Sequence, residues 1–324
     1  MNKLKKALFF SGSGSNFVQE VALVDRLLRN DRVAFSEKDT LLIGSGTGAL
    51  NLIAVNACFR NENPLSWADF YKDQFIGRLN NDQVFVKTDP VHWHSNPFRN
   101  TIYRFVSTCG FSTISDLPYL SQIIVSEHNG TRTKWLKSDS VKSGNLCLTD
   151  ALLATSSIPV LFPPIVLNNC DGVVHSEFQN TYVDGAKNGL FNKVRKQLKK
   201  VVAENGKLEE IFIISPVRFN ELSLLSDFQF VDVSKADKVA LSNYEEQIDL
   251  LAFLSFLFKL ERANKSKKLA NKIWLCMPDL QTTTKIIDFN NLVTEYRKIA
   301  VWLEKNEDQL TVDLIKFNEL AVPV

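Results

Sequence analysis

The sequence has few of the residues that build metal sites or disulfide frameworks. It contains only 4 histidines and 5 cysteines in 324 residues. The cysteines are odd in number, widely spaced and mostly embedded in apolar runs, which is typical of buried thiols in a reducing compartment and indicates no disulfide framework. His92 and His94 have the spacing of metal ligands, but so few histidines leave little to complete a site. We therefore expect surface histidines and no metal.

Net charge and long apolar runs are also lacking. The 38 basic and 36 acidic residues leave a net charge of +2, so we expect no nucleic-acid partner and interpret Lys193–Lys200 and Lys265–Lys268 as solvated helix faces. The longest apolar segment, Leu250–Leu260, is far shorter than the roughly 20 residues of a membrane span. The apolar run at 7–10 is too short for a signal peptide. These features predict a cytoplasmic protein, either free or peripheral to a membrane.

Three glycines at alternate positions mark the stretch around which the sequence is organised. An apolar run of strand length precedes them and an apolar segment with helical spacing follows, which predicts strand, sharp turn and helix. The turn, Gly44-Ser45-Gly46-Thr47-Gly48, has the frame of a nucleophile elbow, G-x-S-x-G, whose central side chain projects at a helix N-terminus. Gly46 stands where such an elbow has its serine.

Two other interpretations of this turn stay open. Gly44, Gly46 and Ala49 also fit the dinucleotide fingerprint G-x-G-x-x-[GA]. That fingerprint expects an acidic residue at the end of the next strand, whereas the acids that follow, Asp69 and Asp73, lie in a segment that looks like a helix start. Alternatively, the glycines only tighten the packing of strand on helix.

The order of elements predicts an α/β fold. A strand at 7–10, a glycine-rich loop at 11–16 and a helix at about 18–30 form one βα unit, and the elbow strand with its helix forms a second. A mostly parallel sheet with helices on both faces follows, with both glycine loops at its carboxyl edge. Residues 120–125 and a strand through Trp135 predict a hairpin-like edge. Residues 210–215 should end the parallel series, with one further strand possible at 272–277.

The remaining segments complete the prediction. The segment 148–159 predicts a short helix with Thr149 as its cap and Pro159 beyond its end. Asp184 ends a short strand directly before Gly185. Taken alone, an Asp-Gly pair is more often a turn than a catalytic site. The chain ends in a helix with one apolar stripe. We predict a single domain over residues 1–324, with a core at about 5–216 and a largely helical extension at about 217–324.

Taken in order, these segments resemble the patatin-like phospholipase family. Four stretches carry the resemblance: Ser11–Asn16, Gly44–Gly48, Ala154–Pro164 and Tyr182–Ala186. The third is the most specific, being close to the family pattern A-T-S-A-A-P-x-x-F-P-P. The resemblance implies a patatin-like α/β fold and hydrolysis of lipid acyl esters by a serine nucleophile and an aspartate base. It implies no cofactor and no metal.

Carried over position by position, the family's site falls on residues that are altered here. Asp184 takes the place of the base, Gly12, Ser13 and Gly14 that of the oxyanion loop, and Gly46 that of the nucleophile. Glycine cannot form an acyl intermediate. The loop at 11–16 reads S-G-S-G-S-N where the family has D-G-G-G-x-R, and 189–192 reads G-L-F-N where it has A-N-N-P.

These departures predict a catalytically inactive protein that keeps the fold as a binding or structural module. The alternative is an active lipid acyl hydrolase whose nucleophile is Ser45 or Ser13. Either form could meet a lipid surface, a protein partner or a second copy through Leu250–Leu260, whose apolar residues nearly encircle a helix. Exposure of Phe253, Phe256 and Phe258 would distinguish such a surface from a buried core helix.

Overall fold

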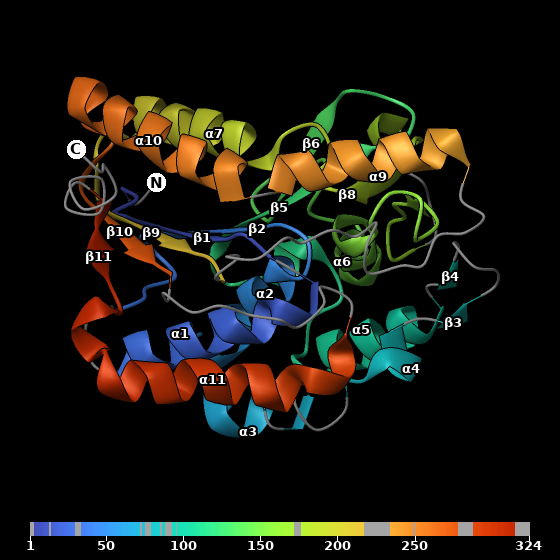
Figure 1. Cartoon of the computed structure of the whole chain (residues 1–324), viewed down its shortest axis with the longest axis horizontal. Helices are drawn as coiled ribbons and strands as arrows, with labels where there is room; N and C mark the ends of the chain where they lie inside the picture. Colours follow the sequence, from blue (N-terminus) through green and yellow to red (C-terminus); the bar gives the residue numbers. More distant parts are fainter. Residues whose placement is uncertain are drawn as a thin grey trace.

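A nine-stranded sheet runs through the centre of the molecule (Figure 1). The computed structural model describes residues 3–314 apart from 13, 30–33, 72, 75–78, 85, 88–92, 95, 172–175, 217–233, 249 and 278–287. The strand order is β11-β10-β9-β1-β2-β5-β8-β7, and β6 pairs with β5. The strands are β1 (Lys6–Phe10), β2 (Thr40–Gly44), β5 (Leu120–Glu127), β6 (Thr133–Lys137), β7 (Ile165–Val166), β8 (Thr181–Asp184), β9 (Leu208–Ile214), β10 (Ala270–Cys276) and β11 (Val312–Asp313).

The centre of the sheet is parallel. β10, β9, β1, β2 and β5 follow one another in parallel, while β11, β6, β8 and β7 pair antiparallel with their neighbours. Phe10 is level with both Gly44 and Ile214, so β1, β2 and β9 end together and their loops emerge at one edge. The parallel series therefore does not end at β9, because β10 extends it. The predicted hairpin is present, but β5 lies inside the sheet and not at its edge.

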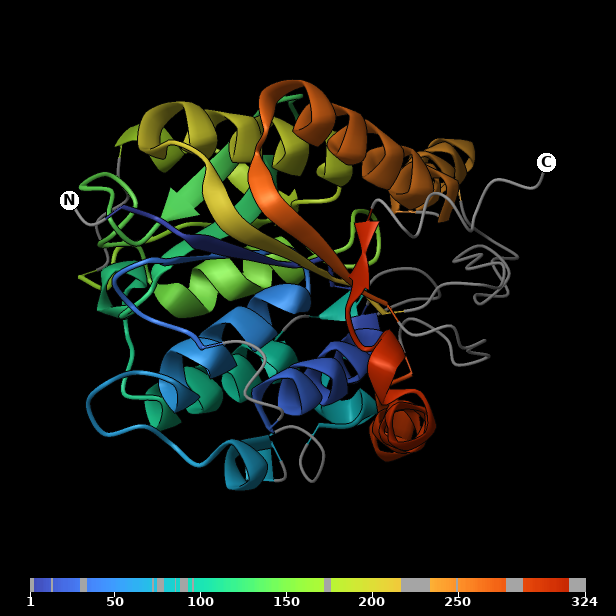
Figure 2. The ribbon, with the colours of Figure 1, turned by 90° about the vertical axis from the view of Figure 1, so that its left-hand side faces the viewer.

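Helices cover both faces of this sheet (Figure 2). On one face lie α7 (Leu190–Asn205), α9 (Lys235–Ile248) and α10 (Leu250–Lys267). On the other lie α1 (Phe17–Arg29), α2 (Gly48–Cys58), α5 (Asn96–Thr108), α6 (Leu148–Ser156) and α11 (Leu292–Lys305). The short elements are α3 (Trp67–Tyr71), α4 (Asn81–Val84), the β3–β4 pair (Val86–Lys87, Trp93–His94) and single turns at 14–16, 114–116, 176–178, 289–291 and 307–309. The predicted α/β class, mostly parallel with helices on both faces and a largely helical C-terminal part, is confirmed.

Three local predictions concern the C-terminal helix, the start of α6 and the two histidines. The predicted C-terminal stripe contains Leu292, Tyr296, Ile299 and Leu303. It is confirmed, since the three aliphatic residues are buried and Tyr296 is partly buried against the core. The cap of α6 is wrong: the helix already begins at Leu148, with Cys147 in the capping position, so Thr149 lies inside its first turn. His94 is exposed, and His92 lies outside the described residues.

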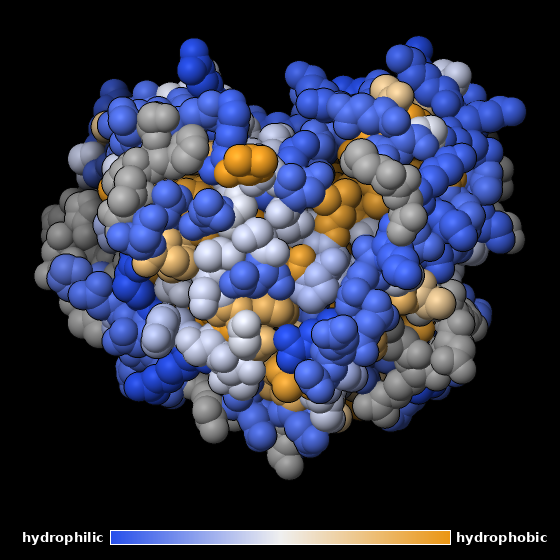
Figure 3. All heavy atoms as spheres, turned by 180° about the vertical axis from the view of Figure 1, so that it is seen from behind, coloured by the Kyte–Doolittle hydropathy of each residue, from blue (hydrophilic) through white to orange (hydrophobic). Residues whose placement is uncertain are grey.

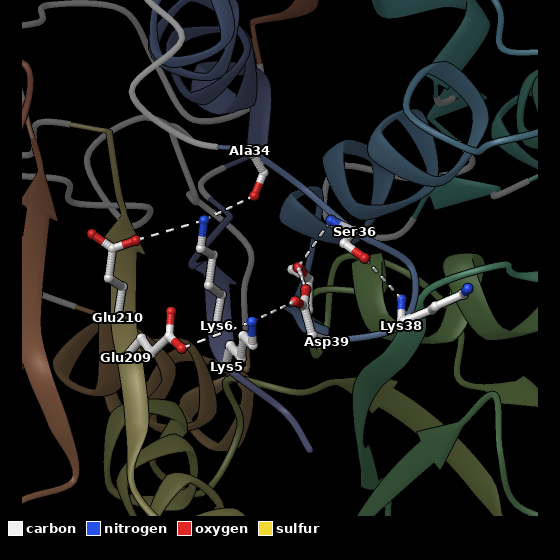
Figure 4. Close-up of polar contacts among 9 residues, drawn as sticks. Lys5, Lys6, Ala34, Ser36, Lys38, Asp39, Glu209 and Glu210 are labelled. Atoms are coloured by element: carbon white, nitrogen blue, oxygen red, sulfur yellow. Dashed lines mark hydrogen bonds and ion pairs between the residues drawn. The ribbon is translucent and has the colours of Figure 1, made fainter. Parts of the chain in front are cut away.

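At the amino ends of the strands, a group of charged residues ties three chain segments together (Figure 4). Lys5 lies 3.9 Å from Asp39 and 4.0 Å from Glu209, and Lys6 lies 3.7 Å from Glu210. Such partly exposed pairs contribute little stability each. The glycine loops emerge at the opposite, carboxyl edge, so the candidate site is separated from this charged end by the length of the strands. In the part of the chain described, no helix combines the length and apolarity needed to cross a membrane.

Candidate functional site

The predicted elbow joins β2 to α2. Gly48 N–H donates to Ser45 O (3.0 Å) and Ala49 N–H to Gly46 O (3.1 Å), which closes a tight turn between strand and helix. A Cβ atom on Gly48 would lie 2.7 Å from both Gly12 N and Phe10 O. The glycines therefore let the loop after β1 pack directly on the elbow, and the two glycine loops meet at one edge as the sequence predicted.

Gly46 occupies the tip of the turn in a left-handed conformation, with φ of 55°. Its N–H donates to Thr155 Oγ1 (3.0 Å), and Thr155 Oγ1 in turn donates to Ile124 O of β5 (2.7 Å). A Cβ atom built on Gly46 would lie 3.2 Å from Asp184 Oδ2. Any side chain at position 46 would thus meet the Asp184 carboxylate.

Asp184 is held in place by hydrogen bonds to the backbone groups of Ser157 and Ala186. Its N–H donates to Ser157 O (2.9 Å), its Oδ1 accepts from Ala186 N–H (2.7 Å), and the residue is only 5% exposed. One carboxylate oxygen is therefore tied to the turn after β8, and the other is the one nearest position 46. The structure brings together Asp184, from β8, and Gly46, from the β2–α2 turn, although 138 residues separate them in sequence.

The first glycine loop is engaged by a buried acid. Gly12 N–H donates to Glu20 Oε1 (2.8 Å), and Ser11 Oγ donates to the same oxygen (3.2 Å). Glu20 Oε2 accepts from Asn51 Nδ2 (2.8 Å), and Glu20 is fully buried. The Gly12 amide could serve an oxyanion at the elbow only by giving up this charge-assisted bond. Gly14 has φ of 57°, and Ser13 lies outside the described residues.

Two buried polar side chains near this edge have no hydrogen-bond partner among the described residues. Both amide atoms of Asn16 and the hydroxyl of Ser45 are buried without a hydrogen bond. Ser45 therefore has no base on its oxygen, and its backbone N–H donates to Phe10 O (3.3 Å). This arrangement does not support Ser45 as a nucleophile, because such a hydroxyl needs an adjacent base.

Two lysines stabilise the turn that follows Asp184. Lys193 Nζ donates to Lys187 O (2.6 Å) and lies 3.4 Å from Ser126 Oγ and 3.5 Å from Gly185 O. Lys187 Nζ donates to the carbonyls of Glu127 and His128. Burial lowers the pKa of Lys193 to about 8, although the Asp184 carboxylate acts in the opposite direction. Burial lowers the pKa of Lys187 as well.

We expect the contribution of Lys193 to the free energy of unfolding to rise with pH above about 8. The folded-state pKa lies below the ordinary value of 10.5, so the unfolded chain binds more protons between these values. The penalty for burying the charged amine is fully present below pH 8 and disappears as pH approaches 10.5.

Burial raises the pKa values of Cys58, Cys109, Cys170 and Cys276, so these thiols act in the opposite direction over the same range. The measurement is therefore a difference: in urea denaturation, the free energy of unfolding of the wild type relative to that of Lys193→Met should rise across this range. Lys196→Met, an exposed lysine on the same helix, should leave the pH dependence of the wild type unchanged; the same pH dependence in all three proteins would contradict the assignment.

Sequence reasoning missed three of these residues. Glu20 lies three positions after Phe17 and four before Val24, so an acid on the buried face of α1 was a detectable signal. Thr155 lies in the most specific stretch of the resemblance, but no role could be read from its type. Lys193 was interpreted as part of a solvated cluster, and nothing in its local pattern distinguishes it from its exposed neighbours.

The described residues contain no group of three or more His, Cys, Asp or Glu side chains arranged to hold a metal ion. No protein-family model matches the chain, and no curated protein matches it. Among solved structures, the chain is similar to VipD from Legionella pneumophila, with 11% sequence identity and a TM-score of 0.33; the match covers 94% of this chain and 80% of VipD. At that level of similarity, the match identifies neither a family nor a function.

Proposed function

We propose that this chain is a patatin-like protein whose hydrolytic site has lost its nucleophile, and that it acts as a binding or structural module. The observation that carries the proposal is the 3.2 Å between Asp184 Oδ2 and a Cβ atom built on Gly46. In a serine–aspartate pair, the base takes the proton of the attacking hydroxyl. Here a fixed carboxylate faces the tip of the elbow, and Gly46 at that tip has no hydroxyl to offer it.

The altered glycine loop supports the same proposal. An oxyanion needs N–H groups aimed at the developing charge. The amide of Gly12 is instead aimed at Glu20, whose carboxylate also accepts from Ser11 and Asn51. A negatively charged side chain behind the loop opposes the binding of a second negative charge in front of it. Both the nucleophile and the oxyanion donors of the family's chemistry are therefore altered.

The geometry favours this proposal over nucleotide binding. A pyrophosphate at the α2 N-terminus would need free N–H groups and no nearby acid. The N–H of Gly46 is bonded to Thr155, those of Gly48 and Ala49 are bonded within the turn, and the Asp184 carboxylate lies beside Gly46. A phosphate placed there would be repelled.

The test is an esterase assay on the full chain with p-nitrophenyl butyrate and with phosphatidylcholine. We expect hydrolysis by the wild-type protein to be no faster than by Asp184→Ala, because no oxygen is available to attack. Ser45→Ala provides the matched control for the neighbouring hydroxyl. Turnover that Asp184→Ala or Ser45→Ala abolishes would show that the chain is an enzyme with a nucleophile other than residue 46.

A further inference from the structure

Two adjacent helices on one face of the sheet concentrate the positive charge of the protein. α7 contains five basic residues and one acidic residue, and α10 contains four basic residues and one acidic residue. The helices pack side by side in both ribbon views (Figure 1; Figure 2). Seen from behind, the surface at the upper right, on the side of α7, is mostly hydrophilic, with a few hydrophobic residues showing between (Figure 3). The fold thus joins two basic clusters that are about 70 residues apart in sequence into one surface.

Basic side chains of the two helices act on one another. The pKa of Lys199 on α7 is lowered by partial desolvation and by the charges of Arg195 and of Lys267, the last residue of α10. Like charges held this close raise the free energy of the isolated protein, and an anionic partner would relieve the repulsion. The combined face is therefore suited to a negatively charged surface.

The outward face of α10 adds apolar side chains to this charge. Leu251 and Phe258 are 74% and 58% exposed and lie seven residues apart, on the same side of the helix. Farther along this side, Arg262 and Lys265 are exposed. Phe253 and Phe256 point the other way and are buried in the core. Of the three phenylalanines whose exposure was to distinguish a surface from a core helix, only Phe258 is exposed. α10 is therefore a core helix on one side and an open surface on the other.

A groove lies between the two helices near their N-terminal ends. It has a volume of about 210 Å³ and a floor formed by buried Phe191 and Phe256. Two basic residues and one acidic residue also line it: Arg195 from α7, Lys259 from α10 and Glu246 from α9. An apolar floor with two cations in the lining fits an amphiphile that has an anionic head.

We propose that the face formed by α7 and the outward side of α10 docks on an anionic phospholipid bilayer. Leu251 and Phe258 enter the interfacial layer, while the exposed basic residues of both helices contact lipid phosphates; Lys193 of α7 is directed inward and takes no part. Peripheral helices bind membranes with this combination of apolar anchors and flanking lysine or arginine. A nucleic acid would use the charges but would have no use for two aliphatic or benzyl side chains set among them. The proposal does not depend on whether residue 46 supports hydrolysis.

Vesicle co-sedimentation of the full chain tests this proposal. We expect binding to phosphatidylcholine vesicles that contain about one-third phosphatidylserine, weak binding to pure phosphatidylcholine, and a steep loss of binding as salt is raised. Lys259→Gln combined with Arg262→Gln removes two exposed charges of α10 and should weaken binding roughly 30-fold, at a factor of about five per charge. Leu251→Ser combined with Phe258→Ser should weaken it at least about tenfold.

Matched variants on α11, on the opposite face of the sheet, serve as controls. Arg297→Gln with Lys305→Gln removes two exposed charges there, and Val293→Ser with Val301→Ser removes two apolar side chains that are 38% and 49% exposed. Neither pair should change vesicle binding. The proposal is wrong if the wild-type chain does not bind the anionic vesicles at low salt, or if the α11 charge variant weakens binding as much as the α10 variant. It is also wrong if Phe258→Ser dissociates a dimer that itself does not bind vesicles, since the partner is then a second copy.

Discussion

Gly46→Ser should give this chain a weak esterase activity that depends on Asp184. The new Cβ atom would lie 3.2 Å from Asp184 Oδ2, so the hydroxyl would be placed at the base. The carboxylate must move by a few tenths of an ångström, and a side chain at φ of 55° costs roughly 1–3 kcal/mol. Elbow serines are strained in the same way, so this cost does not prevent folding.

The oxyanion loop should limit the rate of that variant. Loss of one oxyanion donor typically costs on the order of 10²–10³ in rate, and the Gly12 amide is bonded to Glu20. We therefore expect turnover far below the roughly 10 s⁻¹ of an ordinary enzyme. Adding Ser13→Gly, which restores the middle glycine of the family's loop, should raise it.

The controls separate chemistry from structural disturbance. Gly46→Ala introduces the same backbone strain without an oxygen and should be inert, as should Gly46→Ser combined with Asp184→Asn. Turnover near 10 s⁻¹ in the single variant would show that the loop was never impaired. A folded Gly46→Ser protein that is inert even with Ser13→Gly would show that the site has been remodelled for another purpose.

Gly48→Ala should destabilise the fold by about 3 kcal/mol or more. The added Cβ would lie 2.7 Å from Phe10 O and Gly12 N, and both are backbone atoms. β1 is paired on both sides, with β2 and with β9, so it cannot move away. Overpacking in a rigid interior typically costs 1–3 kcal/mol and occasionally more. Equilibrium unfolding in urea measures the loss.

Gly130→Ala is the matched control for this substitution. Its Cβ would approach Glu127 Oε2 at 2.6 Å, which is an even shorter distance, but this oxygen is the end of a flexible side chain. We expect a cost below about 1 kcal/mol, as for most surface changes. Equal losses in the two variants would mean that the elbow and the first glycine loop are not packed as tightly as the structure has them.

The arrangement of the two glycine loops was predictable because it follows from where the parallel strands end. Alternating glycines between an apolar run and a helical pattern locate an elbow, and parallel strands release their loops at one edge. That rule brings the loop at 11–16 beside Gly46 without any knowledge of side chains. Asp184 could be placed near Gly46 only through the resemblance, because β8 is antiparallel to β5 and no local pattern gives its position in the sheet.

The details that decide the chemistry were not predictable in this way. The bond from Gly12 to Glu20 depends on how far α1 is rotated about its axis, and apolar periodicity fixes that rotation only coarsely. The burial of Lys193 depends on the Ser126 hydroxyl of β5 and on the carbonyl groups of Gly185 and Lys187 in the turn after β8, and only the tertiary fold brings β5 to this turn. For α10, both the buried core helix and the exposed surface were correct in part: one side is buried and the other is exposed. A helix whose sequence is apolar on all sides does not reveal which side faces the core.

The uneven distribution of charge gives the protein an electric dipole. Of a net charge of +2, α7 contributes +4 and α10 contributes +3, which leaves −5 for the rest of the chain. A molecule with such a dipole is oriented by the field of a negatively charged surface before contact. The α7–α10 side is attracted toward the surface, and the remainder of the molecule is repelled. The fraction of encounters that begin in the right orientation then rises, and association becomes faster without any gain in contact area. This electrostatic attraction acts over about one Debye length, roughly 8 Å at physiological salt. As the salt concentration is raised, the rate constant for association should therefore lose its electrostatic enhancement before the equilibrium affinity does.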